Sequence, residues 1–474
     1  MSAQHFIDNA FATLGDPLTI DVVDPTCETV IDRAPKGSAS TVARAVAAAR
    51  AAGPVWAASD VGLRCRVLQQ IADGLDARRG ALRDVLRREL GMPVSECDAA
   101  QIDSAIEVLR DTASVLPAYA FEDRVRNSRV RRIPVGVVAA ITPWNYPLLQ
   151  VAGKLAPALA AGCTVVIKPS EVTPFSVDLL SATLGETELP PGVVNVVHGT
   201  GPETGHALIT HPDVRKVSFT GSTEAGRTIA AAAAADIKRV SLELGGKSPM
   251  LVLPDTEIEP AVDVTVDSLM LNTGQTCSAL TRLVVPRSRK AEAAARAARS
   301  MHAWTVGDPS DPTVRTGPLV NGAQYDRVQH YIETGRAEGA RLVSGGVGRP
   351  DGRNEGYFVR PTVFADVDPK ATIAQAEIFG PVLSVLDYPD ADPEAGIAIA
   401  NDSAFGLYAA VWGADAASAD RAARRIVAGQ VDVNGAPYNG LAPFGGLKHS
   451  GYGREMGPYA IDDYVALQAV QYPG

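Results

Sequence analysis

One cysteine of the five, Cys277, has neighbours that suggest a nucleophile. It lies in the segment Gly-Gln-Thr-Cys-Ser at residues 274–278, after an apolar stretch that predicts a helix. A loop of small residues lets a substrate reach the thiol, and nearby amides or helix dipoles favour the thiolate. The alternative is an inert core residue, because cysteine often behaves as a small hydrophobe. No histidine lies nearby in the sequence to complete a Cys–His pair, so these residues alone leave both interpretations open.

A second chemical candidate is Asn145, in the segment Thr-Pro-Trp-Asn-Tyr-Pro at residues 142–147. Its two prolines make a rigid loop directly after an apolar run that predicts a strand. An asparagine amide in such a loop can donate a hydrogen bond to a developing oxyanion. A proline-rich turn with a packing Trp144 explains this segment equally well.

The segment Phe-Thr-Gly-Ser-Thr-Glu-Ala-Gly at residues 219–226 predicts a strand, a turn and the start of a helix. Free N–H groups of that helix, beside Gly221 and Ser222, can bind phosphate. The spacing is GxxxxG and not the dinucleotide fingerprint GxGxxG, so plain helix capping is the alternative. The Gly-Gly-Lys-Ser at 245–248 resembles the end of a P-loop, but the position of its first glycine is Ser241. We therefore reject a P-loop nucleotide site.

Alternating strands and helices must position these segments. Apolar runs that predict strands lie at 137–141, 164–168, 193–197, 216–219 and 239–243. Helical stretches lie between them at 148–161, 176–184, 202–209 and 223–235. The alternation restarts with a strand at 250–253, a helix at 261–271 and a strand at 281–285. Buried strands that alternate with helices predict an α/β fold with two doubly wound parallel sheets, whose ligands bind beyond the carboxyl ends of the strands.

This pattern suggests where the domains divide. The first expected domain comprises 1–115 and 136–245, with helices at 41–52 and 66–90, and the second comprises 246–447. Two extended stretches, 125–133 and 464–472, would leave strand edges without partners. We therefore assign 116–135 and 448–474 to small β segments outside these two domains.

Composition narrows the class of protein. With 474 residues, 46% of them hydrophobic, the chain is long enough for at least two folded domains. Its net charge of -10 argues against nucleic-acid and membrane surfaces. The N-terminal 11 residues lack the features of a secretory signal, and the apolar stretch at 155–167 is too short to span a bilayer. The scattered cysteines (Cys27, Cys65, Cys97, Cys163 and Cys277) and the seven histidines show no metal-ligand spacing, so we expect a cytoplasmic protein without a metal.

Taken together, the segments resemble the aldehyde dehydrogenase superfamily over residues 22–465. Seven motifs occur in family order: TPWNYP at Thr142, KPSE at Lys168, FTGSTEAGR at Phe219, LELGGKSP at Leu242, GQTC at Gly274, EIFGPV at Glu377 and PFGGLKHSGYGRE at Pro443. Glu243 and Cys277 are separated by 34 residues (277 − 243), a spacing typical of this family.

The resemblance implies catalytic roles. Cys277 would attack an aldehyde to give a thiohemiacetal, and Asn145 with the Cys277 backbone N–H would hold its oxyanion. Hydride transfer would leave a thioester, which water activated by Glu243 would hydrolyse to the carboxylic acid. Lys154 would relay protons or orient its neighbours, although a surface-facing helix end is the plain alternative. The presence of Glu243 favours hydrolysis over transfer of the acyl group to coenzyme A.

The resemblance also implies a cofactor site for NAD, with NADP possible. Lys168 and Glu171 would bind the adenosine ribose, and Glu171 favours NAD because a carboxylate repels a 2′-phosphate. Glu377 would hold the nicotinamide ribose, with Phe379 beside the ring. The remaining expected cofactor residues are Thr142, Pro143, Trp144, Gly201, Gly205, Phe219, Gly221, Ser222, Leu244 and Gly245.

The substrate-pocket walls implied by the resemblance are Tyr146, Gly153, Ser278, Tyr438 and Phe444. Many family members carry a bulky aromatic residue at the position of Gly153, so we expect a wider channel mouth here. In this resemblance the segments 116–135 and 448–474 would form a small bridging β flap, through which subunits pair as a homodimer or homotetramer. Two alternatives remain: a cofactor-independent thiol esterase that uses Cys277, and a non-catalytic scaffold of the same fold.

Overall fold

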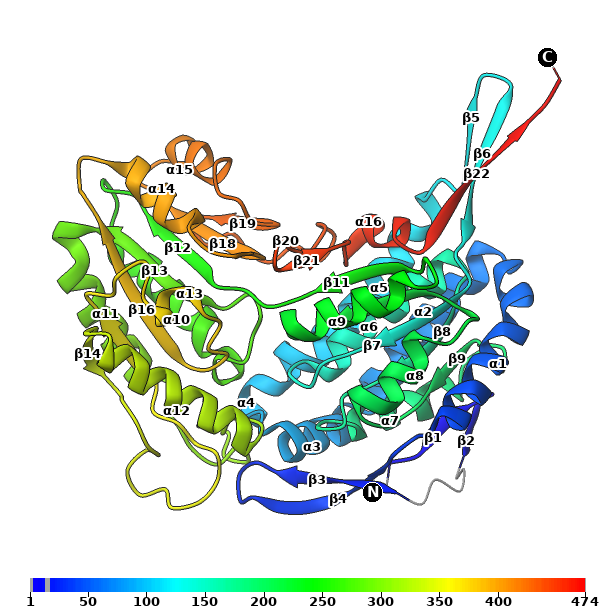
Figure 1. Cartoon of the computed structure of the whole chain (residues 1–474), viewed down its shortest axis with the longest axis horizontal. Helices are drawn as coiled ribbons and strands as arrows, with labels where there is room; N and C mark the ends of the chain where they lie inside the picture. The colour runs from blue at the N-terminus through cyan, green and yellow to red at the C-terminus, as the bar shows by residue number, and fades with distance from the viewer. Residues whose placement is uncertain (1–2, 13–17, 474) are drawn as a thin grey trace.

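The computed structural model describes residues 3–12 and 18–473. Two α/β bodies lie side by side, and a narrow antiparallel sheet projects from one of them (Figure 1). Residues 1–2, part of the N-terminal segment in which no secretory signal is expected, lie outside the described residues, as do 13–17 and 474.

The first body contains an eight-stranded sheet in the order β2-β1-β9-β8-β7-β10-β11-β21. Its five central strands are parallel: β9 (Val194–Val196), β8 (Thr164–Lys168), β7 (Val137–Ile141), β10 (Val214–Thr220) and β11 (Arg239–Glu243). The edge strands β1 (His5–Ile7), β2 (Ala10–Ala12) and β21 (Gly451–Tyr452) pair antiparallel. The parallel register places the carboxyl ends of β7, β10 and β11 at one edge of the sheet, where Thr142, Gly221 and Leu244 follow.

Helices cover both faces of this sheet, and alternate side chains of its strands therefore enter two different hydrophobic cores. In β7, Val138 and Ala140 pack into one core, and Val137, Ala139 and Ile141 pack into the other. The first core contains side chains of α2 (Val61–Ala77), α3 (Arg79–Leu90), α5 (Ser104–Val115), α6 (Pro147–Ala161) and α7 (Phe175–Leu184). The second contains those of α1 (Ala39–Ala57), α8 (His206–Ile209) and α9 (Thr223–Ala234).

The second body repeats this arrangement around a seven-stranded sheet in the order β14-β15-β16-β13-β12-β18-β19. The strands are β12 (Ser248–Val252), β13 (Leu280–Pro286), β14 (Arg341–Ser344), β15 (Thr362–Ala365), β16 (Val382–Tyr388), β18 (Tyr408–Trp412) and β19 (Gln430–Val433), and only β14 pairs antiparallel. Met250 and Val252 pack with α10 (Ile258–Met270) and α11 (Lys290–His302). Leu251 packs on the other face, which is covered by α12 (Gly322–Ala337), α13 (Thr372–Gln375), α14 (Pro393–Asn401) and α15 (Ala416–Ala423).

Smaller elements complete the fold. The projecting sheet has the order β22-β6-β5, from β22 (Val465–Gln471), β6 (Ser128–Pro134) and β5 (Glu122–Val125). Two further antiparallel pairs join β3 (Thr19–Asp24) to β4 (Thr29–Pro35) and β17 (Phe405–Gly406) to β20 (Leu447–Lys448). The short helical elements are α4 (Val94–Cys97), η1 (Asp98–Asp103), η2 (Leu116–Ala118), η3 (Gly201–Gly205), η4 (Leu271–Gly274), η5 (Arg287–Arg289) and α16 (Gly457–Asp462).

The structure corrects several expected boundaries. The helix expected at 66–90 is two helices, α2 and α3, which meet at Arg78. The β3–β4 hairpin was not anticipated. Residues 448–464 do not belong to the projecting sheet, because β21 pairs with β11 in the first body and α16 contacts α6. Only β22 of the expected segment 448–474 pairs with β6.

None of the helices in the described part of the chain combines the length and apolar character needed to cross a membrane. Within 3–12 and 18–473, no group of three or more His, Cys, Asp or Glu side chains is placed to hold a metal ion.

Candidate active site

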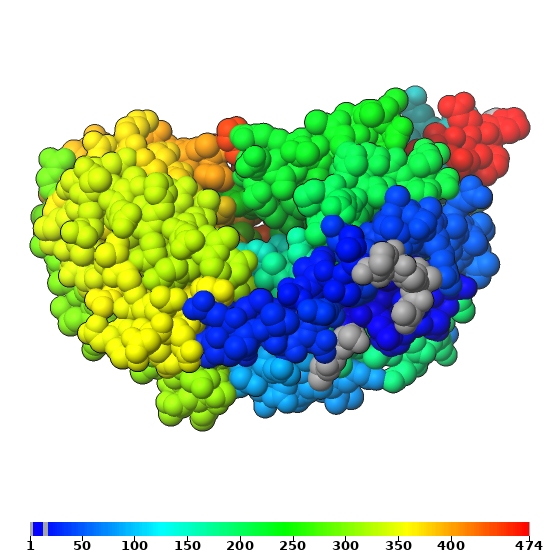
Figure 2. Space-filling view, turned by 60° about the horizontal axis from the view of Figure 1, so that its bottom comes forward, coloured from blue at the N-terminus to red at the C-terminus, as the bar shows by residue number. Residues whose placement is uncertain are grey.

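A cavity of about 250 Å³ lies where the carboxyl ends of β7, β10 and β11 face the second body. In the space-filling view, a recess separates the green and the yellow-green parts of the surface (Figure 2). Eleven of the residues expected at the site line this cavity: Pro143, Trp144, Asn145, Gly221, Ser222, Glu243, Leu244, Gly245, Cys277, Glu377 and Phe379. Residues more than 200 positions apart in the chain thus share one space.

Cys277 lies on the loop after η4, and its side chain is only partly buried. Burial raises the pKa of its thiol to about 12, and the charges of Glu377 and Glu243 add to this. Gly246 lies against the main chain of the same loop, since a Cβ there would be 2.5 Å from the Cys277 carbonyl oxygen. The absence of a side chain at Gly246 therefore lets this loop approach the end of β11 closely.

Asn145 comes from the loop between β7 and α6, and its side chain is buried. Its Nδ2 donates to the main-chain oxygen of Gln275, two residues before the cysteine, at 2.8 Å. One hydrogen of the amide is engaged by this bond, and Asn145 also lines the cavity with Cys277. An amide donor and a thiol thus face the same space.

Glu243, the last residue of β11, is buried at the floor of the cavity. Neither of its carboxylate oxygens has a hydrogen-bond partner among the described residues. Burial raises the pKa of Glu243 well above its ordinary value, and the charge of Glu455 raises it further, while Lys154 lowers it. A buried carboxylate with free lone pairs and a raised pKa has the properties of a general base.

Lys154 is fully buried on α6, so the surface-facing alternative is wrong. Its Nζ donates to Thr220 Oγ1 at 2.6 Å and forms an ion pair with Glu455. Glu455 is a functional candidate that the sequence interpretation missed, although it ends the quoted PFGGLKHSGYGRE motif. The pair brings a cation and a second carboxylate into the surroundings of Glu243.

Other groups that line the cavity suit a phosphate and sugar hydroxyls. Ser222 caps α9, with its Oγ accepting from the Ala225 backbone N–H at 3.2 Å, and it lines the cavity with Gly221. The Glu377 carboxylate accepts from the Gly246 backbone N–H at 3.0 Å. Burial raises the pKa of Glu377 to about 6, which keeps it largely ionised at neutral pH. Phe379 packs edge-on against Trp144, with ring centroids 5.4 Å apart.

The comparisons with known proteins agree with this geometry. The model of the aldehyde dehydrogenase family matches residues 13–470. The chain belongs to the aldehyde dehydrogenase family. It is 42% identical over 468 residues to a 3-succinoylsemialdehyde-pyridine dehydrogenase of a Pseudomonas species, covering 98% of each chain.

Solved structures of aldehyde dehydrogenases have the same fold. A mutant of aldehyde dehydrogenase C from Pseudomonas syringae, in complex with NAD+ and octanal, matches with a TM-score of 0.97 and 44% identity, over 99% of this chain and 96% of that one. An NAD+ complex from Mycobacterium tuberculosis matches with a TM-score of 0.96 and 39% identity, over 100% and 98% of the two chains. The expected family and the expected α/β architecture are confirmed.

Several expected cofactor residues of this aldehyde dehydrogenase lie outside the walls of the cavity. Lys168 at the end of β8 is buried, donates to Glu171 at 3.1 Å, and lies near Gly205 of η3. A Cβ at Gly201, in contrast, would meet nothing within 4 Å. The other two are Thr142 and Phe219, which are buried beside the cavity.

The expected substrate residues are only partly gathered by the structure. Tyr146 is buried, and its hydroxyl lies 2.6 Å from Thr276 Oγ1, next to Cys277. Phe444 pairs through its backbone with Glu455, whereas Tyr438 is exposed by 59%. Ser278 is half-buried. None of these four residues lines the 250 Å³ cavity.

The wider channel mouth expected at Gly153 is not found. A Cβ on Gly153 would lie 3.2 Å from the Glu455 carboxylate and 3.6 Å from Met456. The space that a bulky side chain would need is therefore filled by these two neighbours. The glycine makes room for the buried partner of Lys154.

The sequence analysis missed other residues of the cavity because they belong to no motif that indicates a function. Gln324 and Arg327 lie on α12, and their side chains donate to main-chain oxygens of Ile378 and Phe379. Phe379 has a positive φ of 65°, so these bonds support a backbone conformation that L residues rarely adopt. Thr220, the partner of Lys154, also lines the cavity. Only the fold shows these contributions.

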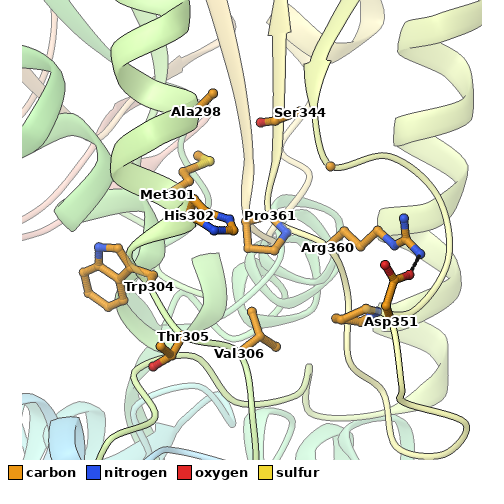
Figure 3. A pocket seen from close by; sticks show the side chains of 12 residues that line it. Ala298, Met301, His302, Trp304, Thr305, Val306, Ser344, Asp351, Arg360 and Pro361 are labelled. Atoms are coloured by element: carbon orange, nitrogen blue, oxygen red, sulfur yellow. Dashed lines mark hydrogen bonds and ion pairs between the residues drawn. The ribbon is translucent and has the colours of Figure 1, made fainter.

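A second, larger cavity of about 550 Å³ lies in the second body, between the end of α11 and the loops around Ser344 and Arg360 (Figure 3). Its polar lining includes an ion pair of Arg360 with Asp351 at 2.7 Å. Its lining contains no cysteine and none of the residues of the seven motifs. Cys277, Asn145 and Glu243 line the smaller cavity instead.

Proposed function

We propose that this chain oxidises an aldehyde to a carboxylic acid through a thioester on Cys277, with NAD+ as the oxidant. The observation that carries the proposal is the single cavity shared by Cys277, Asn145, Glu243 and the N-terminus of α9. A nucleophile, an oxyanion donor, a base and an anion-binding helix end are the parts that this reaction needs. The relatives named for aldehyde oxidation support it.

The residues fit NAD+ as the cofactor. The N-terminus of α9 lies at the cavity, where Gly221 and Ser222 line the wall, and the first-turn N–H groups of this helix suit a pyrophosphate. The Glu377 carboxylate, held by one backbone N–H, can accept hydroxyls of the nicotinamide ribose. The ion pair of Lys168 with Glu171 disfavours a 2′-phosphate, because the carboxylate partly cancels the lysine charge. When bound, NAD+ supplies the hydride acceptor.

The chain's own residues carry the other steps. Glu243, which lines the same cavity, accepts the proton of the Cys277 thiol, and the thiolate attacks the carbonyl carbon. The electron pair of the C=O bond moves onto oxygen, where the free N–H of Asn145 Nδ2 and the backbone N–H of Cys277 bind it. After loss of hydride the carbon remains bonded to sulfur as a thioester. Glu243 takes a proton from water, the hydroxide attacks the thioester, and the thiolate leaves with the acid released. Lys154 and Glu455 lie beside Glu243 and suit transfer of that proton away.

The test measures NADH formation across an aldehyde panel with NAD+ or NADP+. Cys277→Ala should abolish turnover, whereas the matched control Cys27→Ala, at another partly buried cysteine, should leave it unchanged. A Cys277→Ala enzyme that still forms NADH at the wild-type rate would overturn the proposal.

We also propose that the projecting sheet pairs subunits into a homodimer or homotetramer. Both edges of β22-β6-β5 are open in a single chain, and the sheet exposes Leu467 by 71% and Val125 by 54%. Open edges with apolar side chains are typical of association surfaces. Light scattering should give at least a dimer, and Leu467→Asp should lower the mass; a monomeric wild type would refute the assignment.

A further inference from the structure

A group of buried side-chain amides surrounds the corner where Asn145 meets the cysteine loop. The main-chain oxygen of Asn145 accepts two hydrogen bonds, from Gln101 Nε2 at 3.0 Å and from Asn272 Nδ2 at 2.9 Å. Both donors are buried, with exposures of 0% and 3%. The Asn145 backbone is therefore held from two sides by residues that lie 44 and 127 positions away.

Gln275 completes the group from the cysteine loop. Its main-chain oxygen accepts from Asn145 Nδ2 at 2.8 Å, and its own Nε2 donates to the Asn272 main-chain oxygen at 3.1 Å. Its Oε1 accepts from the Val320 backbone N–H at 2.9 Å. The loop that carries Cys277 and the loop that carries Asn145 are thus joined by direct hydrogen bonds.

These bonds determine which way the Asn145 amide points. A main-chain oxygen can only accept, so the Gln275 oxygen requires Nδ2 of Asn145, and not Oδ1, to face it. The second hydrogen of the same Nδ2 is then free, and Asn145 lines the cavity beside Cys277. A rotated amide would instead place two oxygens against each other.

The cysteine loop needs this support because its backbone is unusual. Asn272 and Thr273 have left-handed φ values of 51° and 56°, and Gly274 follows with 76°. Left-handed backbone is disfavoured for L residues, less so for asparagine, and persists where surrounding contacts impose it. Gly274 admits no side chain, since a Cβ would lie 2.3 Å from the Gly380 carbonyl carbon. Thr273 Oγ1 donates to the Gly317 oxygen at 3.2 Å.

The placement of Gln101 also depends on an irregular element. It lies in η1, a π-helical segment between α4 and α5. Such segments insert an extra residue into a helix and occur often at functional sites. Here the irregular turn carries a buried glutamine whose side-chain Nε2 donates to the main-chain oxygen of Asn145.

We propose that Gln101 and Asn272 are positioning residues for aldehyde oxidation: they fix the Asn145 main chain so that its side-chain amide is aimed at the oxyanion formed over Cys277. The inference rests on the proposed function, because it takes Asn145 as the oxyanion donor. Neither residue touches the substrate. Their effect should appear in the chemical steps that develop negative charge on oxygen, and not in cofactor binding.

The experiment compares Gln101→Leu and Asn272→Gly, which remove the two donors one at a time. Glycine at 272 keeps the left-handed backbone accessible. Gln375→Leu is the matched control, because Gln375 also donates its side-chain amide to main-chain oxygens but lies in the second body. Asn145→Ala supplies the effect of losing the oxyanion donor itself.

We expect kcat to fall about 10- to 100-fold in both variants, less than the roughly 10²- to 10³-fold loss typical of deleting an oxyanion donor. Cleavage of 4-nitrophenyl acetate without NAD+ should fall by a similar factor, because it develops the same oxyanion. The Kd for NAD+ and the rate of Cys277 alkylation by iodoacetamide should stay within about threefold of wild type, since neither needs an oxyanion. Gln375→Leu should leave all four values unchanged.

Two results would overturn the inference while the proposed function stands. One is an unchanged kcat in both variants beside a large loss in Asn145→Ala. The other is a parallel loss of NAD+ affinity, alkylation rate and activity, which a purely structural role predicts. If Asn145→Ala itself leaves kcat unchanged, the proposed oxyanion role and this inference fall together.

Discussion

Breaking the Lys154–Glu455 pair should destabilise the protein and move its pH profile. The pair is fully buried, so Lys154→Met leaves the Glu455 carboxylate without its cation. Removing one partner of a buried ion pair typically costs about 3–5 kcal/mol of unfolding free energy. The double variant Lys154→Met/Glu455→Gln removes both charges and should recover most of that loss.

The same substitution should affect Glu243, whose pKa the Lys154 charge lowers. Without the lysine the pKa of Glu243 rises further, and the ionised base forms only at higher pH. The acidic limb of the kcat profile should therefore shift to higher pH in Lys154→Met. In the double variant the shift should be smaller, because the Glu455 charge that raises the same pKa is also gone.

Denaturant unfolding at constant protein concentration measures the loss of unfolding free energy. The dependence of kcat on pH measures the shift in the pKa of Glu243. Lys290→Met is a suitable control, because this lysine pairs with Asp366 and Asp387 at a partly exposed position. Exposed pairs are typically worth less than about 1 kcal/mol. If Lys154→Met is as stable as wild type and its kcat profile does not move, the described electrostatics of Glu243 are wrong.

Three further outcomes follow from the geometry. Asn145→Ala should lower kcat by about 10²- to 10³-fold with the Kd for NAD+ unchanged, as measured by stopped-flow and fluorescence titration; an unchanged kcat would exclude it as the oxyanion donor. The thioester-hydrolysis rate should fall as pH decreases through the raised pKa of Glu243, since only the ionised carboxylate accepts a proton, and Glu243→Gln should remove this dependence in single-turnover experiments. Gly245→Ala should weaken NAD+ binding about tenfold (about 1.4 kcal/mol), because its Cβ would lie 2.2 Å from the Glu377 carboxylate. The control Gly53→Ala, whose Cβ would have no atom within 4 Å, should bind NAD+ as wild type does in the same calorimetric titration.

The sequence best predicted the features that depend on neighbouring residues in the chain, such as strands and the loops that follow them. The predicted strands Val137–Ile141 and Arg239–Glu243 are the observed strands β7 and β11. In β7 all five residues are apolar and buried, as a strand covered on both faces requires. The loops after strands follow from the same topology, and so Asn145 and Gly221 were placed correctly at the cavity.

The sequence was least informative where contacts join distant segments. Glu455 reaches Lys154 across 301 positions, and Gln101 reaches Asn145 through an irregular helix that no propensity predicts. Gly153 illustrates the opposite error: a missing side chain suggested open space, but the fold fills it with Glu455 and Met456. The break at Arg78 was missed because the amphipathic pattern continues from α2 into α3.

The most direct test of the account is the mass of the enzyme during turnover. Glu243→Gln, mixed with NAD+ and excess octanal and then quenched in acid, should accumulate an octanoyl group on the protein, and peptide mapping should place it on Cys277. Wild type should carry far less of it, because Glu243 promotes its hydrolysis. An acyl group on another residue, or NADH formation with no covalent adduct in the variant, would contradict the central claim that Cys277 and Glu243 act on one thioester.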